Sequence, residues 1–166
     1  MTARISIFLI VTVMSWYGMM AFHEAGHCLG AVAAGGPIRA VDMPLLGFSQ
    51  THYRGNPHPL FVAWSGPVGG AVVSLALSAL SLRLRGRPRD VLLYFCGFCL
   101  IANGIYIGLG GFDRVGDCAE LLNHGARLWQ LILFGFVATC LGGYCWHLLG
   151  PVRGWFEQGG SSKREE

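Results

Sequence analysis

The sequence predicts an all-α membrane protein with about four transmembrane helices and a short interfacial hairpin or loop after the first. Two observations support this prediction. Of the 166 residues, 53% are hydrophobic and only 13% are charged, whereas a soluble domain has about 25% charged residues. In addition, four apolar stretches reach the roughly 20 residues that a helix needs to cross the hydrocarbon core. These stretches are residues 5–34, 60–82, 91–109 and 128–149.

The first apolar stretch, residues 5–34, has no small-residue cleavage pattern, so we expect a retained membrane span rather than a signal peptide. Its helix should end near residues 35–37, Gly-Gly-Pro, because glycine permits a left-handed cap and proline cannot continue a helix. A loop follows as far as Pro59. Within this loop, residues 39–53 partly alternate between polar and apolar, which favours short strands at a membrane interface.

The second stretch opens with a glycine-rich patch, residues 64–70, that allows neighbouring backbones to approach closely. Between the second and third stretches, residues 83–89 form a basic loop, which we interpret as a solvated topological anchor. Residues 159–166 are polar and small, and we expect a disordered tail there. Residues 1–158 are therefore predicted to form a single membrane domain.

The first stretch contains residues 23–27, His-Glu-Ala-Gly-His, which have the form H-E-x-x-H. Ionisable side chains are costly at membrane depth, so their presence indicates a functional site. Residues four apart on a helix share one face, so His23 and His27 can bind a single metal ion. Glu24 follows the first histidine and can take a proton from an attacking water. The motif therefore predicts a hydrolytic Zn²⁺ site.

A catalytic zinc ion usually takes three protein ligands, so a third ligand must come from elsewhere. The motif begins about 18 residues into its span, roughly 27 Å along a straight helix, and so lies near the far end. The third span runs in the same direction as the first. Asp113 and Asp117 follow its far end and should lie on the same membrane face as the motif. Either carboxylate can complete the site.

These features resemble the site-2 protease family of intramembrane zinc metallopeptidases. The resemblance rests on H-E-A-G-H in the first span, Gly66-Pro67 at the start of the second, and an asparagine followed by an aspartate late in the third. It covers about residues 15–122. It implies a zinc endopeptidase that hydrolyses peptide bonds of membrane proteins, with Glu24 as the catalytic base and Asn103 orienting the substrate backbone.

The third span departs from the family's pattern, in which Asn-x-x-Pro is followed by Leu-Asp-Gly and the aspartate is the third zinc ligand. Here Tyr106 occupies the proline position and no Leu-Asp-Gly follows. Asp117 precedes a Leu-Leu pair in the family's longer register, so we predict it as the third ligand, with Asp113 as the runner-up. The family's proline breaks the helix before the ligand. We expect the three glycines within residues 108–111 to do so here.

The expected partners are the lipid bilayer and a membrane protein or peptide substrate. Basic residues flank the spans and form no stripe, which argues against a nucleic-acid partner. We predict an integral, multi-pass protein of the cell membrane. Its orientation stays open, because the positive-inside rule places the motif outside the cytoplasm, whereas the resemblance implies the cytoplasmic side.

A different function has to be weighed against proteolysis. The same histidines could serve a non-catalytic membrane metal-binding or assembly protein, or a small metal-handling protein. Glu24 argues against these alternatives, because metal binding alone does not need a general base beside the ligand. The missing Leu-Asp-Gly argues slightly for them.

Overall fold

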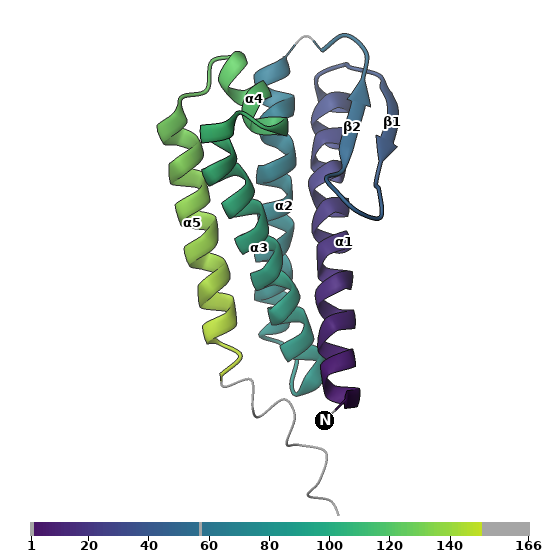
Figure 1. The fold of residues 1–166 in the computed structure, drawn as a ribbon, viewed down its shortest axis with the longest axis vertical. Helices are drawn as coiled ribbons and strands as arrows, with labels where there is room; N and C mark the ends of the chain where they lie inside the picture. The colour runs from purple at the N-terminus through teal and green to yellow at the C-terminus, as the bar shows by residue number, and fades with distance from the viewer. Residues whose placement is uncertain (1, 57, 151–166) are drawn as a thin grey trace, which may run out of the picture.

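The computed structural model describes residues 2–56 and 58–150, and in these residues four long helices stand side by side (Figure 1). They are α1 (Thr2–Ala33), α2 (Pro59–Ser81), α3 (Arg87–Asp113) and α5 (Leu128–His147). Each is long and apolar enough to cross a membrane. The predicted all-α membrane fold with four spans is therefore confirmed. The predicted tail at residues 159–166 and the end of the predicted domain lie outside the described residues.

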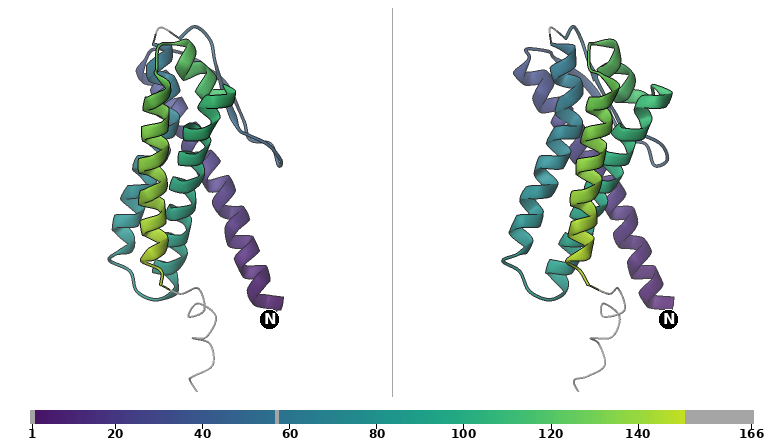
Figure 2. Two further views of the ribbon diagram at one scale, coloured as in Figure 1. Left: turned by 60° about the vertical axis from the view of Figure 1, so that its left-hand side comes forward. Right: turned by 90° about the vertical axis from the view of Figure 1, so that its left-hand side faces the viewer.

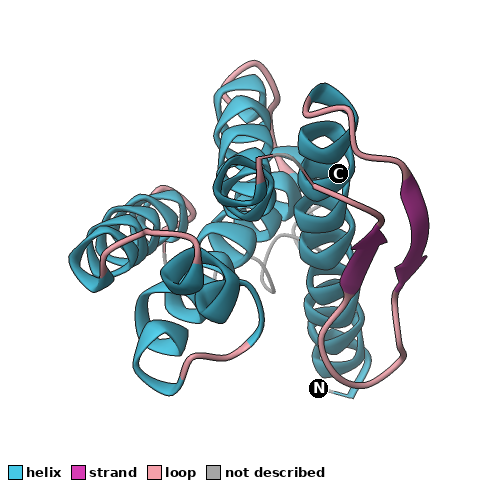
Figure 3. Ribbon diagram, turned by 90° about the horizontal axis from the view of Figure 1, so that it is seen from above, coloured by secondary structure: helices cyan, strands magenta, loops and turns pink. Residues whose placement is uncertain are grey.

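The shorter elements gather at one end of the bundle (Figure 1). Strands β1 (Ile38–Asp42) and β2 (Gln50–Tyr53) pair in an antiparallel hairpin after α1, as the sequence predicts. Viewed from above, this hairpin lies along the outer side of α1 (Figure 3). A short helix, α4 (Gly116–Asn123), follows α3 at the same end. The last turns of α1 and α3 thus meet the start of α2, the hairpin and α4.

The four long helices are not equally packed. Helix α1 leans away from the other three toward its N-terminus (Figure 2) and approaches them at the end that carries the hairpin. Glycines bring α3 and α5 together: a Cβ added to Gly135 of α5 would lie 2.6 Å from both the Gly104 carbonyl oxygen and the Gly108 Cα of α3. Lipid is as apolar as the side chains, so close van der Waals packing of this kind holds membrane helices together.

The prediction that glycines in residues 108–111 break α3 is wrong. Helix α3 continues through them and ends at Asp113. The reason is packing: a Cβ on Gly108 would lie 3.1 Å from Gly135 Cα, so these glycines permit close helix contacts and the contacts keep them helical. The chain turns only afterwards, at Arg114 and Gly116, whose φ angles are 52° and 50°.

Gly135→Ala is expected to destabilise the folded protein by about 1–3 kcal/mol, because the added methyl group meets backbone atoms that cannot rotate away. Gly143→Ala in the same helix is the matched control, since a Cβ there has no neighbour within 4 Å. Thermal unfolding of both variants in detergent measures the difference. An unfolding temperature for Gly135→Ala at or above that of Gly143→Ala would contradict backbone contact between α3 and α5.

Candidate metal centre

The H-E-x-x-H motif lies in the last turns of α1, within the part of the helix that approaches the bundle. His23 and His27 share one face of the helix, and their exposed fractions are 4% and 5%. Glu24 is 3% exposed. Polar groups buried to this extent are stable only when they have partners, and each of the three has them.

The motif packs against the glycine-rich start of α2. A Cβ on Gly66 would overlap the imidazole ring of His27, and a Cβ on Gly26 would overlap the Ser65 carbonyl oxygen. The patch predicted to allow close backbone approach therefore makes room for one of the two motif rings.

Hydrogen bonds place a proton on Nδ1 of both imidazole rings. His27 Nδ1 donates to the Val62 carbonyl oxygen at 2.8 Å. Asn103 Nδ2 donates to the Pro67 carbonyl oxygen at 2.7 Å, so its Oδ1 faces His23 and accepts from His23 Nδ1 at 3.1 Å. A neutral imidazole with its proton on Nδ1 presents a lone pair at Nε2. Both Nε2 atoms therefore face a third group, and each presents its lone pair when its ring is neutral.

That third group is the carboxylate of Asp117. Its Oδ2 lies 2.7 Å from His23 Nε2, and its Oδ1 lies 3.3 Å from His27 Nε2. The two Nε2 atoms are 3.0 Å apart. Three potential ligand atoms thus converge, all within 4.8 Å of one another, and such a group is stable only with a positive charge among its members, either on a protonated imidazole or on a bound cation. Two imidazole nitrogens and one carboxylate oxygen fit a catalytic zinc ion.

Asp117 reaches this position from the first turn of α4, which follows the turn at Arg114 and Gly116. Burial alone would raise the pKa of the Asp117 carboxyl, but its hydrogen bonds with His23 and His27 hold that pKa well below the usual range. The side chain is therefore a charged carboxylate. Asp113, the runner-up, is exposed at the end of α3 and does not join this group.

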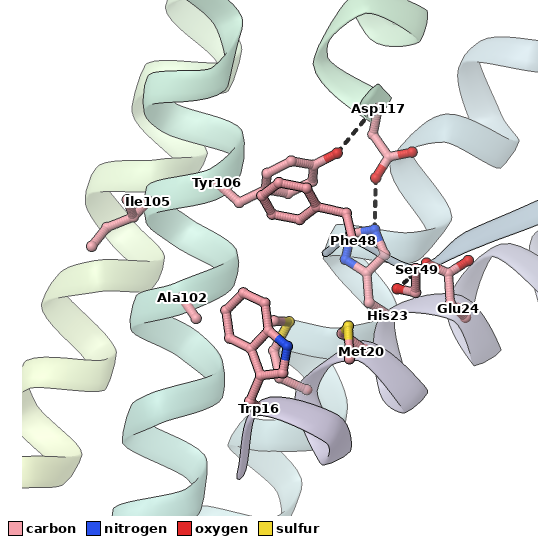
Figure 4. Close-up of a pocket in the computed structure, with 11 residues that line it drawn as sticks. Trp16, Met20, His23, Glu24, Phe48, Ser49, Ala102, Ile105, Tyr106 and Asp117 are labelled. Atoms are coloured by element: carbon pink, nitrogen blue, oxygen red, sulfur yellow. Dashed lines mark hydrogen bonds and ion pairs between the residues drawn. The ribbon is translucent and has the colours of Figure 1, made fainter. Parts of the chain in front are cut away.

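Glu24 points from α1 toward the hairpin (Figure 4). Ser49 Oγ donates to one carboxylate oxygen at 2.7 Å, and Thr51 Oγ1 donates to the other at 2.5 Å. These neutral hydroxyls orient the carboxylate without adding a cation beside it. The sequence analysis missed Ser49 and Thr51, because hydroxyl residues in a loop carry no distinct signal until the pairing of β1 and β2 places them.

An apolar cavity of about 260 Å³ opens beside His23, Glu24 and Asp117 (Figure 4). Its other walls are mostly apolar side chains from α1, the hairpin loop and α3. They are Trp16, Met19, Met20, Phe48, Ser49, Ala102, Ile105 and Tyr106. Binding sites commonly combine such apolar walls with a few convergent polar groups. The cavity can therefore hold an apolar side chain next to the candidate metal centre.

Asn103 lies in α3 with an exposed fraction of 2%. Both polar atoms of its side chain bond within the protein, one to His23 and one to Pro67. In this conformation it holds the ring of the first histidine. Its contact with the substrate backbone, which the resemblance implies, stays a prediction.

In the described residues, four membrane-spanning helices with two buried histidines and a part-buried carboxylate converging at one end define a polytopic membrane protein with a candidate metal centre. The chain belongs to the Peptidase M50B-like family, whose model matches residues 3–108. The predicted resemblance to site-2 proteases, a family of intramembrane metallopeptidases, is thereby confirmed. The matched residues include the whole H-E-x-x-H motif and Asn103, and they end before Asp117. Comparison with curated proteins and with solved structures finds no match.

Proposed function

We propose that the protein is an intramembrane zinc metalloendopeptidase in which His23, His27 and Asp117 hold the zinc ion and Glu24 is the catalytic base. The observation that carries the proposal is the convergence of two imidazole Nε2 atoms and a carboxylate beside a hydrogen-bonded glutamate. Family membership supports it, because the M50 peptidases are zinc enzymes. The proposal includes the single membrane domain expected over residues 1–158.

A bound zinc ion supplies a Lewis acid that polarises the peptide carbonyl and makes water a better nucleophile. Glu24 accepts a proton from the attacking water as the water oxygen bonds to the carbonyl carbon. It then passes that proton to the amine nitrogen as the C–N bond breaks. One water is consumed, and the products are a carboxylic acid and an amine, which become a carboxylate and an ammonium group when the remaining acid proton passes to the amine. Asn103 and Val62 keep the histidine protons on Nδ1 throughout.

The substrate in this proposal is a membrane protein segment that becomes extended at the cleaved bond. A membrane helix satisfies all of its backbone groups internally, so its peptide bond is exposed only where the helix unwinds. The apolar cavity beside Glu24 can then take a side chain next to the cleaved bond. An extended segment can also pair with the edge of the neighbouring hairpin.

The experiment is a cleavage assay with the purified protein in liposomes and a pool of single-span membrane peptides of differing sequence. We expect a chelator to stop cleavage and added Zn²⁺ to restore it, with product masses that sum to the peptide plus one water. A protein that binds one zinc ion per chain and cleaves no peptide in the pool would favour the non-catalytic metal-binding alternative.

Thr51→Val is expected to lower kcat by about tenfold, because one oxygen of the Glu24 carboxylate loses its hydrogen bond and the base is less well oriented. Thr51→Ser keeps the hydroxyl and is the matched control, with a kcat near that of the wild type. KM and zinc content should change little in either variant. Equal kcat values for the two variants would show that the Thr51 hydroxyl does not orient the base.

A further inference from the structure

We propose that Tyr106 positions the third metal ligand, Asp117, and so replaces the proline that the site-2 protease family has at this place in the third span. This inference rests on the proposed function, because it concerns a ligand of the same site. Tyr106 lies on α3 about two turns before the helix ends. Its ring forms part of the cavity wall near His23, with the ring centroids 6.0 Å apart (Figure 4).

The Tyr106 hydroxyl contacts the backbone of the residue that carries the carboxylate. The Asp117 backbone N–H donates to Tyr106 Oη at 3.0 Å (Figure 4). This N–H belongs to the first turn of α4, where backbone donors have no partner within the helix. The hydroxyl therefore satisfies a donor that would otherwise be unpaired, and it fixes the place where α4 begins.

The residues before and after Asp117 pack against the same turn of α3. A Cβ on Gly116 would overlap the Tyr106 hydroxyl, so the chain passes directly over that oxygen. Cys118 Sγ donates to the carbonyl oxygens of Tyr106 and Ile107 at 3.5 and 3.6 Å. Residues 116–118 are thus docked on one turn of α3, with Asp117 between the two contacts.

The ring of Tyr106 is itself held from the hairpin. Phe48 stacks on it with ring centroids 5.4 Å apart and an interplanar angle of 24° (Figure 4). The tyrosine thus lies between the hairpin loop and the start of α4.

An unbroken α3 explains why such an anchor is needed. In the family pattern the proline breaks the third helix before the ligand. Here α3 continues to Asp113, and the ligand arrives on a separate short helix after a turn. A proline at position 106 would supply no hydroxyl for the Asp117 N–H.

The test is the zinc affinity of the full-length protein in detergent, measured by competition with a chromogenic chelator. Tyr106→Phe keeps the ring and removes the hydroxyl, and we expect zinc affinity to fall about 10–100-fold, as for other outer-shell partners of metal ligands. Tyr94→Phe is the matched control, because its hydroxyl bonds to Thr12 at 2.8 Å, away from the site. Its zinc affinity should equal that of the wild type.

Two further measurements separate positioning from general damage. The metal-free Tyr106→Phe and Tyr94→Phe proteins should unfold at similar temperatures. In an Asp117→Ala background, Tyr106→Phe should cause no additional loss of zinc affinity, because its effect passes through the aspartate. Wild-type zinc affinity in Tyr106→Phe, or an equal loss with and without Asp117, would overturn the inference. A wild-type protein that binds no zinc would instead refute the proposed function.

Discussion

Glu24→Gln is expected to eliminate measurable peptide cleavage while zinc binding stays at one ion per chain. The amide cannot accept a proton from the attacking water, and loss of a general base typically costs about 10²–10⁴-fold in rate. Glutamine has the same shape, and its amide can still form hydrogen bonds with Ser49 and Thr51. Cleavage and zinc content are measured on the same preparation. A variant that cleaves at the wild-type rate would show that Glu24 is not the base.

In the structure Glu24 lies next to the three converging ligand atoms but is not one of them. Its carboxylate oxygens bond to two hydroxyls of the hairpin, whereas the converging group consists of His23, His27 and Asp117. Glu24→Gln should therefore separate catalysis from metal binding. A simultaneous loss of zinc would indicate that Glu24 is itself a ligand.

Asp117→Ala is expected to weaken zinc binding more strongly than the loss of an outer-shell partner does, which typically costs about 10–100-fold in metal affinity. The variant leaves two histidines, and a zinc site with two protein ligands lacks the three that catalytic sites use. Asp113→Ala is the matched control, since this exposed aspartate lies only four positions earlier in the chain. Its zinc affinity should be that of the wild type. Zinc loss in Asp113→Ala with retention in Asp117→Ala would reverse the assignment.

Much of this arrangement could be predicted from sequence because its signals are local. Apolar runs of the right length predict the four spans, and the alternation of polar and apolar residues in residues 39–53 predicts the strands of the hairpin. The spacing of His23 and His27 places both on one helical face in any α-helix. These properties depend on the chain's own periodicity and on the thickness of the bilayer.

The rest depends on contacts between distant segments. Gly108 and Gly111 permit either a break or a close contact, and their packing against helix α5 selects the contact. The choice between Asp113 and Asp117 depends on the turn at residues 114–116, where positive φ angles at Arg114 and Gly116 leave no hydrophobic pattern. The hydroxyls around Glu24 depend on strand pairing. The position of Tyr106 was identified in the sequence, but its contact with Asp117 was not.

The hairpin contacts residues of the candidate site directly. Ser49 and Thr51 hold the proposed base, while Phe48 stacks on the tyrosine beside the proposed third ligand. A segment of four residues therefore contacts both halves of the site. Changes in this segment should affect base orientation through its hydroxyls and zinc affinity through its aromatic ring.

An experimental structure of the zinc-loaded protein, with the ion located by its anomalous scattering, would decide the assignment of the site. We expect a single ion bound by His23 Nε2, His27 Nε2 and an Asp117 carboxylate oxygen at about 2.0–2.2 Å. Glu24 should lie outside the coordination shell and remain bonded to the hairpin hydroxyls. An ion bound by Asp113 or Glu24 in place of Asp117, or bound away from the two histidines, would contradict the proposed metal centre.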